Sequence, residues 1–447
     1  MRGRVKFVTL VLFLCTGIIL STGIAGAEKW VTTDRLGNPG AKVTLSWWVI
    51  APHYNQSAYE SRNVTWTRLY ASWAVKHPNV KINVTPVPGE KIHATMMKLL
   101  EAAAVGRAPD MAEVDSFFVP RFVLAKTLQP LNEFFTKEEI NDYFKFTRDI
   151  VTDKEGNVRA LWWDTDMRAL YYRKDLVPTP PRTWDELIKV ASNISKTKGI
   201  AGYLYNGARW EATTFDNIAM FWAQGGRLVD DVGKPVFNEG KNREYMLNLL
   251  RFLKRTVDSG ASPPRVVNVK AYDDMNAEAK AGTVAMFLGG NWQIRQLKEI
   301  LPPEEFKKWD VALIPQKTAE IACTGTGGWT FGIFTADPVK KREAFNFLWS
   351  SYGSRDAAAA ACKAGGYLPT RKSVYQDFYF FKADPWNQKW AKMLKYGKAR
   401  PGFPIYPTIS EQLQIAIGEV LTGMKTPEEA LNNAWKNVVR EYKRIKA

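Results

Sequence analysis

Cysteine and histidine are scarce in this sequence, with three residues of each among 447. Cys15 lies near the N-terminus, which leaves Cys323 and Cys362 for the remainder of the chain. Two cysteines are too few for a disulfide scaffold, so a hydrophobic core must hold the fold together. The sequence leaves open whether these two thiols pair, because pairing depends on their separation in space.

Zinc and catalytic motifs are missing as well. The histidines, His53, His77 and His93, follow no spacing that is typical of a zinc site, so we expect no metal and no other cofactor. There is no G-x-S-x-G elbow. Asp and Glu are plentiful, but no pair lies in a context that singles it out for catalysis. The sequence therefore indicates a protein that is not an enzyme.

Long apolar runs are absent beyond the N-terminus. The first 27 residues contain early basic residues, an apolar run over 7–20 and the small residues Ala25-Gly26-Ala27. This order is typical of a signal peptide. The run of about 14 residues is shorter than the roughly 20 that span a bilayer. We predict a signal peptide over residues 1–27, cleaved after Ala27, with an uncleaved membrane anchor as the alternative.

Cys15 raises the question of a lipid anchor. A lipid-bearing cysteine follows the apolar run and a small residue, whereas Cys15 lies inside the run, directly after Phe13-Leu14. We interpret it as part of the run and expect no lipid anchor there. The mature chain is expected to be soluble, in the periplasm or outside the cell.

Concentrated positive charge is also missing, although the formal net charge is +17. Lysine and arginine are spread along the chain, with no run of five and no recognisable nucleic-acid-binding module. We therefore expect a solvated basic surface and no nucleic-acid partner.

Apolar residues predict alternating strands and helices. Residues 43–50 and 80–87 have the pattern of strands. Apolar residues at helical spacing predict one helix that contains Trp66 to Trp73 and ends before Pro78, and another over residues 92–105. Such alternation is typical of an α/β fold. Residues 28–41 are rich in Gly, Pro, Asn and charged residues and are predicted to form a mobile leader.

Tryptophan is abundant, with 17 residues. Most should be core, but Trp48, Trp163, Trp292 and Trp329 lie at the ends of predicted strands or beside glycines. In parallel α/β sheets ligands bind at strand ends. Flat aromatic rings cover the apolar faces of a sugar, and Asp, Asn and Arg bond its hydroxyls. This pattern favours a carbohydrate site.

Several segments together resemble extracellular solute-binding proteins of family 1, the sugar-binding subunits of ABC importers. The matching segments are GRAPDMAEVD (106–115), LQPL (128–131), ALYYRKDL (169–176), PRTWDEL (181–187), AQGG (223–226), AGTVAM through Trp292 (281–292), Gly327-Gly328, LPTR (368–371) and TPEEAL (426–431). Each motif alone is weak. Their order and spacing, over nearly the whole mature chain, carry the resemblance.

The resemblance implies an α/β, two-lobed periplasmic-binding-protein fold of class II type, with a hinge between the lobes. Lobe one would comprise residues 28–163 and 310–350, and lobe two residues 164–309 and 351–447. The chain would be a monomer that captures a sugar or oligosaccharide between the lobes and delivers it to ABC permease subunits in the membrane, with no catalysis.

Two alternatives stay open. A protein of the same fold could bind an anion such as glycerol phosphate or an acidic oligosaccharide, which the basic balance and Arg168 or Arg371 would suit. In a different class, the chain could be an exported glycosidase.

The resemblance also implies ligand-binding residues. Trp292 matches the tryptophan that stacks on a sugar ring in this family. The full set comprises Trp48, His53, Asp115, Asp164, Asp166, Trp210, Glu211, Asn291, Trp292, Gly328, Trp329, Tyr367 and Arg371. Of Asp164 and Asp166, one is expected to be only a surface residue.

Overall fold

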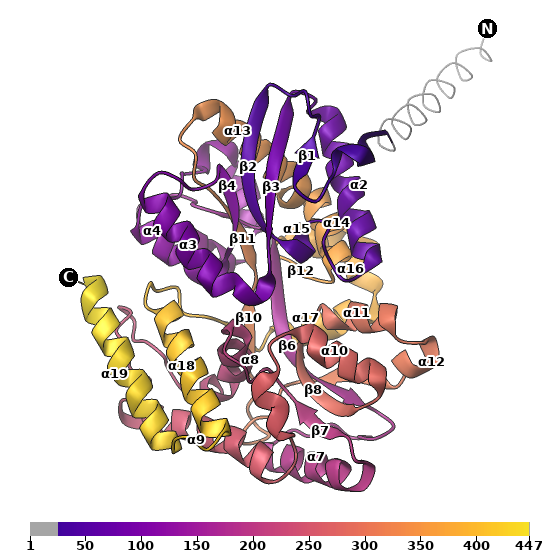
Figure 1. Ribbon diagram of the computed structural model, residues 1–447, viewed down its shortest axis with the longest axis vertical. Coiled ribbons are helices and arrows are strands. Elements are labelled where there is room, and N and C mark those ends of the chain that lie inside the picture. Colours follow the sequence, from indigo (N-terminus) through magenta and orange to yellow (C-terminus); the bar gives the residue numbers. More distant parts are fainter. Residues whose placement is uncertain (1–25, 447) are drawn as a thin grey trace.

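The computed structural model describes residues 26–446 as two α/β lobes, one above the other in Figure 1. Most of the predicted signal peptide, including Cys15, lies outside these residues. No helix within residues 26–446 has the length and apolar character that crossing a bilayer requires.

The upper lobe is built on a six-stranded sheet with the order β1-β3-β2-β4-β11-β5. Its strands are β1 (Arg35–Gly37), β2 (Val43–Ile50), β3 (Val80–Val87), β4 (Met111–Asp115), β5 (Leu161–Trp162) and β11 (Trp329–Ile333). Strand β2 is parallel to β3 and β4, and the other neighbours are antiparallel. Its helices are α2 (Glu60–Lys76), α3 (Ile92–Ala104), α4 (Val119–Leu124), α5 (Lys137–Asp142), α6 (Lys145–Val151), α13 (Pro338–Leu348), α14 (Arg355–Gly365), α15 (Lys372–Asp377) and α16 (Tyr379–Ala383).

The lower lobe is built on a seven-stranded sheet in which β13-β10-β6-β8-β7 lie in order and β9 and β12 also pair with β6. Its strands are β6 (Asp164–Arg173), β7 (Ala201–Leu204), β8 (Val284–Gly290), β9 (Trp309–Ala312), β10 (Thr324–Gly327), β12 (Leu368–Pro369) and β13 (Gly397–Ala399). Its helices are α7 (Trp184–Lys198), α8 (Glu211–Trp222), α9 (Gly240–Asp258), α10 (Tyr272–Ala281), α11 (Gln293–Ile300), α12 (Pro303–Phe306), α17 (Pro385–Leu394), α18 (Tyr406–Leu421) and α19 (Pro427–Lys446).

Two chain segments pass almost without interruption from one sheet to the other. Strand β5 continues into β6 after Trp163 alone, and β10 continues into β11 after Gly328 alone. Gly328 has a φ of +138°, and a Cβ there would lie 2.1 Å from the carbonyl oxygen of Asp164 on the other crossing segment. The two crossings therefore touch where only glycine fits.

Local sequence signals account for much of this architecture. The predicted strands 43–50 and 80–87 are β2 and β3, and the predicted helices correspond to α2 and α3. Thr183 and Glu186 form the reciprocal bonds of a capping box at the start of α7, and Thr426 and Glu429 do the same at α19. The prediction for residues 28–41 is wrong, because this segment contains β1, which pairs with β3.

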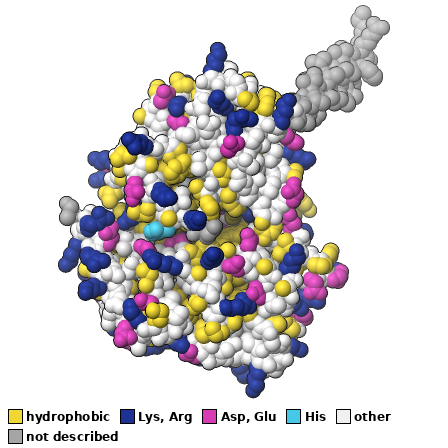
Figure 2. Space-filling view, in the orientation of Figure 1, with side chains coloured by type: hydrophobic (Ala, Val, Ile, Leu, Met, Phe, Trp, Pro, Cys, Tyr) yellow, Lys and Arg dark blue, Asp and Glu magenta, His cyan; other side chains and the backbone are white. Residues whose placement is uncertain are grey.

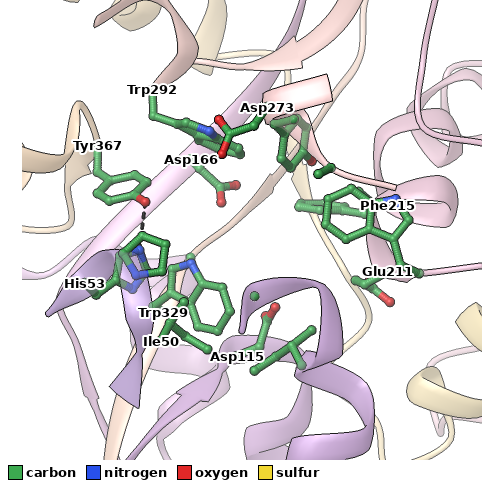
Figure 3. Close-up of a pocket in the computed structure, with 18 of the residues that line it drawn as sticks. Ile50, His53, Asp115, Asp166, Glu211, Phe215, Asp273, Trp292, Trp329 and Tyr367 are labelled. Atoms are coloured by element: carbon green, nitrogen blue, oxygen red, sulfur yellow. Dashed lines mark hydrogen bonds between the residues drawn. The ribbon is translucent and has the colours of Figure 1, made fainter. Parts of the chain in front are cut away.

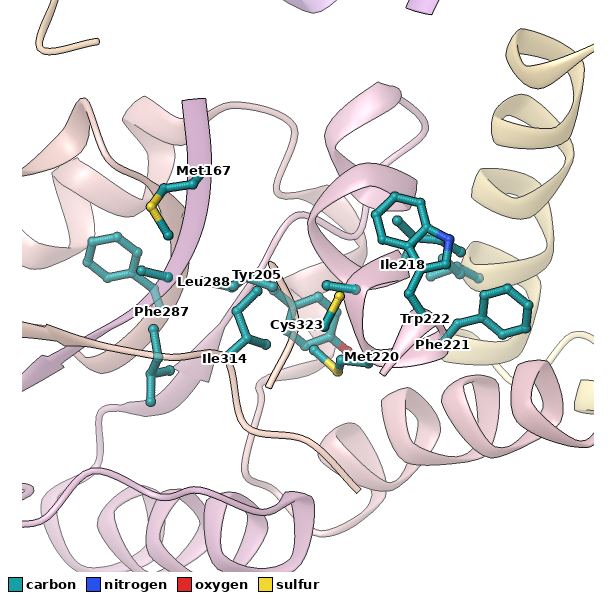
Figure 4. Packing of buried hydrophobic residues seen from close by; sticks show 14 of the residues in the cluster. Met167, Tyr205, Ile218, Met220, Phe221, Trp222, Phe287, Leu288, Ile314 and Cys323 are labelled. Carbon is teal, nitrogen blue, oxygen red and sulfur yellow. The ribbon is translucent and has the colours of Figure 1, made fainter. Parts of the chain in front are cut away.

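The hydrophobic core lies in two main clusters. One fills the lower lobe, as Figure 4 shows around Phe287, Leu288 and Cys323, and continues to the face of the upper sheet beneath α3 and α4. The other covers the opposite face of the upper sheet and is rich in aromatic rings such as Trp47 and Trp66. Cys323 lies in the first cluster and Cys362 in the second, and both are free thiols.

Two segments lie elsewhere than the boundaries expected from the sequence. Strands β9 and β10, within the 310–350 segment expected in lobe one, pair with β6 in the lower sheet. Helix α14, within the 351–447 segment expected in lobe two, packs against α2 of the upper lobe. The chain therefore crosses between lobes at Trp163 and at Gly328, and for the last time between α16 and α17.

Candidate functional site

A cavity of about 210 Å³ lies between the lobes, and we call it the interlobe cleft. Figure 2 shows the molecule hollowed across its middle, with Lys and Arg scattered over the visible face. The cleft is lined from the upper lobe by Ile50, Pro52, His53, Arg62, Gly89, Ile92, Asp115, Trp329 and Tyr367, and from the lower lobe and the crossings by Asp166, Arg168, Trp210, Glu211, Ala212, Phe215, Ala271, Tyr272, Asp273, Trp292, Gln296, Gly328 and Arg400.

Aromatic rings form one wall of the cleft. Trp292 contacts Tyr272 edge to face at 4.8 Å between ring centroids, and Tyr272 contacts Trp210 at 5.3 Å. Tyr367 lies 5.9 Å from Trp292 and continues the wall into the upper lobe. In Figure 3, Trp292 and Tyr367 face the cleft on one side, with Phe215 and Glu211 on the other. Such a wall covers an apolar ligand face.

Trp292 is held in place by the residues that precede it. A Cβ at Gly290 would lie 2.2 Å from the Trp292 ring, so glycine makes room for the indole. Asn291 is fully buried, accepts a bond from the Met167 amide at 2.9 Å and donates to the Gly366 carbonyl at 2.8 Å. Asn291 therefore fixes the turn that aims Trp292 and does not itself line the cleft.

Arg168 is the centre of an ion-pair cluster within the lower lobe. It donates to Asp166 at 2.8 Å and to Asp216 at 2.6 Å, and its guanidinium lies 4.2 Å above the Phe215 ring. Asp216 also accepts from Tyr272 at 2.7 Å. Burial alone would lower the pKa of Arg168, but these carboxylates raise it well above its ordinary value.

Arg400 is the centre of a second cluster, and this one joins the lobes. It donates to Asp115 of the upper lobe at 2.6 Å and to Glu211 of the lower lobe at 3.1 Å, and it lies 4.1 Å above the same Phe215 ring. Burial raises the pKa of Asp115 to about 7, against the opposing effect of Arg400. Glu211 also accepts from Tyr406 at 3.0 Å.

His53 links the floor of the cleft to its aromatic wall. Its Nδ1 lies 2.8 Å from Glu113, and its Nε2 lies 2.7 Å from the Tyr367 hydroxyl (Figure 3). Glu113 also accepts from the Ile50 amide at 2.9 Å and from the Trp163 indole at 3.2 Å. Both ring nitrogens of His53 thus have protein partners, so the ring has a positioning role.

Contacts at both ends of the cleft join the lobes. At one end the Tyr59 hydroxyl donates to Asp273 at 2.9 Å, and Ser61 Oγ donates to Glu299 at 2.5 Å. At the other end, Arg121 on α4 donates to the Pro404 carbonyl at 2.9 Å and to Glu441 on α19 at 3.3 Å. The structure therefore has the lobes in direct contact around the cleft.

Nine of the predicted ligand-binding residues line the cleft. They are His53, Asp115, Asp166, Trp210, Glu211, Trp292, Gly328, Trp329 and Tyr367.

Four predicted residues lie elsewhere. Trp48 packs against the core, and Arg371 pairs with Asp142 at 2.6 Å and donates to the Gly353 carbonyl. Asn291 supports the turn before Trp292. Asp164 is fully buried, against the expectation that one of the two acids lies on the surface, and its Oδ1 accepts from the Trp329 amide at 2.7 Å.

Sequence reasoning missed several residues that line the cleft. The most important are Arg62, Arg168, Phe215, Tyr272, Asp273 and Arg400. Arg168 was noticed only as a possible anion partner, and its position two residues after Asp166 on one strand was the available signal. Arg400 lies in no motif and reaches the cleft only because β13 pairs with β10.

The side chains that line the cleft are suited to binding a ligand. Asp115, Asp166 and Glu211 are bonded to arginines, and Asp273 is bonded to Tyr59. Within residues 26–446 no group of three His, Cys, Asp or Glu side chains could hold a metal ion. The remaining carboxylate oxygens and the aromatic rings suit hydroxyls and apolar ring faces.

Comparisons with known proteins agree with this geometry. A family model described as bacterial extracellular solute-binding protein matches residues 69–395. A probable ABC transporter-binding protein from Deinococcus radiodurans is 27% identical over 295 residues, which are 62% of this chain and 67% of that protein. A maltotriose-binding protein from Pyrococcus abyssi is 23% identical over 340 residues, which are 74% and 68% of the two chains.

Solved structures share the fold. Maltose-bound MalE3 from T. maritima superposes with a TM-score of 0.76 at 24% identity, over 90% of this chain and 100% of that chain. An ABC transporter solute-binding protein from Thermotoga lettingae, bound with α-D-tagatose, gives a TM-score of 0.75 at 28% identity, over 89% and 99%. These likenesses agree with two lobes around a cleft.

Proposed function

The chain belongs to the family of bacterial extracellular solute-binding proteins, and from this premise we propose that it captures a short, neutral sugar in the interlobe cleft and delivers it to the permease of an ABC importer. The observation that carries the proposal is the aromatic wall of Trp292, Tyr272 and Trp210. It shares the cleft with Asp115, Asp166 and Asp273, each of which has one carboxylate oxygen without a hydrogen-bond donor among residues 26–446, whereas both oxygens of Glu211 are bonded. Relatives that bind maltose, maltotriose and tagatose support a sugar ligand.

The charge arrangement favours a neutral ligand over an anion. Arg168 and Arg400 each bond two carboxylates, and Arg371 is paired outside the cleft. Arg168 and Arg371, the cations that would suit an anion, are therefore neutralised, and the remaining cleft arginine, Arg62, donates to the Gly365 carbonyl. A cavity of about 210 Å³ is small beside the roughly 300–1,000 Å³ of typical ligand sites, which favours one or two sugar rings over a long chain.

Capture, and not turnover, follows from the same geometry. The lobes approach each other around the ligand, and a ligand that contacts both lobes favours the closed form by its differential affinity. The buried cleft acids are bonded to cations or hydroxyls. We propose that the protein is therefore a carrier that presents its closed form to a membrane partner.

A titration panel tests this proposal. We expect calorimetry with the mature chain to detect glucose, maltose, maltotriose or tagatose, and saturation at 100 times Kd to stabilise the fold by about 2.7 kcal/mol. Trp292→Ala should weaken that binding at least tenfold, whereas Trp435→Ala, on α19 away from the cleft, should leave it unchanged. If glycerol phosphate or glucuronate binds and no neutral sugar does, the proposal of a neutral ligand is wrong. If the protein releases reducing sugar from an oligosaccharide, the proposal that it is a carrier is wrong.

A further inference from the structure

A second cavity, of about 370 Å³, lies between α11, the end of α14 and α17, and we call it the α11–α17 cavity. It is larger than the interlobe cleft. Both lobes line it: Lys363 and Phe380 come from the upper lobe, and Arg295, Lys298, Trp386 and Trp390 from the lower.

Cations in this cavity lack carboxylate partners. Within residues 26–446, no ion pair involves Arg295, Lys298 or Lys363. The acids in the cavity are engaged otherwise: Glu299 accepts from Ser61, and Asp384 accepts from two amides at the start of α17. The three cations outnumber the two carboxylates, so the cavity has a net positive charge, and within residues 26–446 none of these cations is held in a salt bridge.

A further arginine adds to this charge. Arg62 is only 4% exposed, lies beside Ser61 and donates to the Gly365 carbonyl, and no carboxylate pairs with it in the described part of the chain. Burial lowers the pKa of Arg295, and the charge of Arg62 lowers it further, against the opposing effect of Glu299. Half-buried guanidinium groups are normally paired, and neighbouring cations repel each other, so an anion would stabilise this region.

Aromatic side chains also line the α11–α17 cavity. Phe380 and Trp386 are partly exposed walls of the cavity, and the buried Trp390 lies at its floor. Lys363 Nζ lies 5.0 Å above the Phe380 ring. We propose that the α11–α17 cavity binds a small organic anion with a flat ring, its carboxylate or phosphate held by Arg295, Lys298 and Lys363 and its ring covered by Trp386 and Phe380.

Tyr367 connects this cavity to the interlobe cleft, because it lines both. Its hydroxyl bonds His53 in the cleft at 2.7 Å, and the adjacent Gly366 carbonyl accepts from Asn291, beside Trp292. An anion that contacts both lobes has a different affinity for the open and closed forms. Resting on the proposed function, anion binding should therefore change the affinity for sugar.

Calorimetry with phenyl phosphate tests the site, with phenol as the uncharged control and ionic strength held constant. We expect phenyl phosphate, but not phenol, to bind the mature chain. Arg295→Gln should weaken binding at least tenfold and Lys363→Gln about threefold, while Arg295→Lys retains part of it. Arg62→Gln removes a neighbouring charge that lines the cleft and not this cavity, so it should weaken binding clearly less than Arg295→Gln does.

Three results would overturn the proposed anion site. The first is that phenyl phosphate does not bind, and the second is that wild type and a folded Arg295→Gln variant bind it equally. The third is that binding is lost in Arg62→Gln but not in Arg295→Gln, which would place the anion in the cleft.

The coupling between the two sites is measured by titrating sugar with and without phenyl phosphate. We expect the Kd for sugar to change at least threefold, and an unchanged Kd would contradict the coupling. If no sugar binds while phenyl phosphate does, the proposed function fails and the anion site stands.

Discussion

The ion-pair clusters around Arg168 and Arg400 have the same chemistry, but the first lies within one lobe and the second joins the two lobes. Each guanidinium bonds two carboxylates, and both lie over the ring of Phe215, at 4.2 and 4.1 Å. All partners of Arg168 belong to the lower lobe, whereas Arg400 joins Asp115 of the upper lobe to Glu211 of the lower. From this difference we expect a buried ion pair within a lobe to support folding and one between lobes to support closure.

Removing Arg168 should give the largest effect. Arg168→Gln leaves Asp166 and Asp216 buried without their cation, and we expect the free energy of unfolding to fall by about 3–5 kcal/mol. Denaturant unfolding measures this change. Arg173→Gln, on the same strand but paired with a surface carboxylate, should cost less than about 1 kcal/mol. Equal losses in the two variants would contradict the role assigned to the Arg168 cluster.

Asp115 should make stability depend on pH. Its pKa is about 7 in the folded protein and 3.8 as its ordinary value, because burial disfavours the carboxylate. Between those two values the unfolded chain releases a proton that the folded chain keeps, so stability falls as pH rises from about 4 to 7 and then levels off. We expect about 2 kcal/mol less stability at pH 8 than at pH 5 from this group.

The variant Asp115→Asn isolates this contribution. Its amide cannot ionise but still accepts from Arg400, so the difference between wild type and variant should change with pH in the direction given above. The measurement is denaturant unfolding at pH 5 and pH 8. A difference that stays constant between these values means that another group titrates.

Arg400 should act mainly on ligand binding. In Arg400→Gln the lobes can open and hydrate Asp115, so most of the effect falls on closure. We expect sugar affinity to fall about tenfold, or 1.4 kcal/mol, with a larger radius of gyration in solution scattering. Arg227→Gln, which breaks an exposed pair with Asp231, is the matched control and should change neither quantity. Loss of stability as large as in Arg168→Gln, without a change in closure, would erase the distinction between the clusters.

Tyr59 should give the smallest effect, because it supports closure through a neutral hydroxyl. Tyr59→Phe removes the hydroxyl that donates to Asp273 and accepts from Asn276 across the lobes. A hydrogen bond of this kind contributes about 0.5–1.5 kcal/mol, and we expect sugar affinity to fall about threefold. Titration calorimetry measures it, with Tyr379→Phe as the control, since that side chain is 82% exposed. Equal affinities in the two variants would show that this contact does not support closure.

The sequence predicted local structure well and the two arginine clusters poorly. Strands β2 and β3 and the capping box at Thr183 follow from patterns within about ten residues, which neighbouring side chains determine. Trp292 was identified because its motif is local too. Arg400 is brought to Asp115 across 285 positions by the pairing of β13 with β10, and no local pattern contains that information.

Differences in role between residues that are close in the sequence were harder still to predict. Asp164 and Asp166 are two residues apart, and only the structure shows that one is buried beneath the Trp329 amide while the other lines the cleft. Likewise, Asn291 next to Trp292 is a structural residue, because its amide is used on both sides by the backbone.

The passage of β5 into β6 has an evolutionary consequence. Asp166 and Arg168, which shape the cleft, lie on the same short stretch of backbone that carries the chain from one lobe to the other. We expect a substitution there that changes ligand preference to change the motion between the lobes as well. Changes in ligand preference should therefore accumulate first at Trp210, at the start of α8, because it contacts Tyr272 of its own lobe, whereas Asp273 accepts a hydrogen bond from the other lobe.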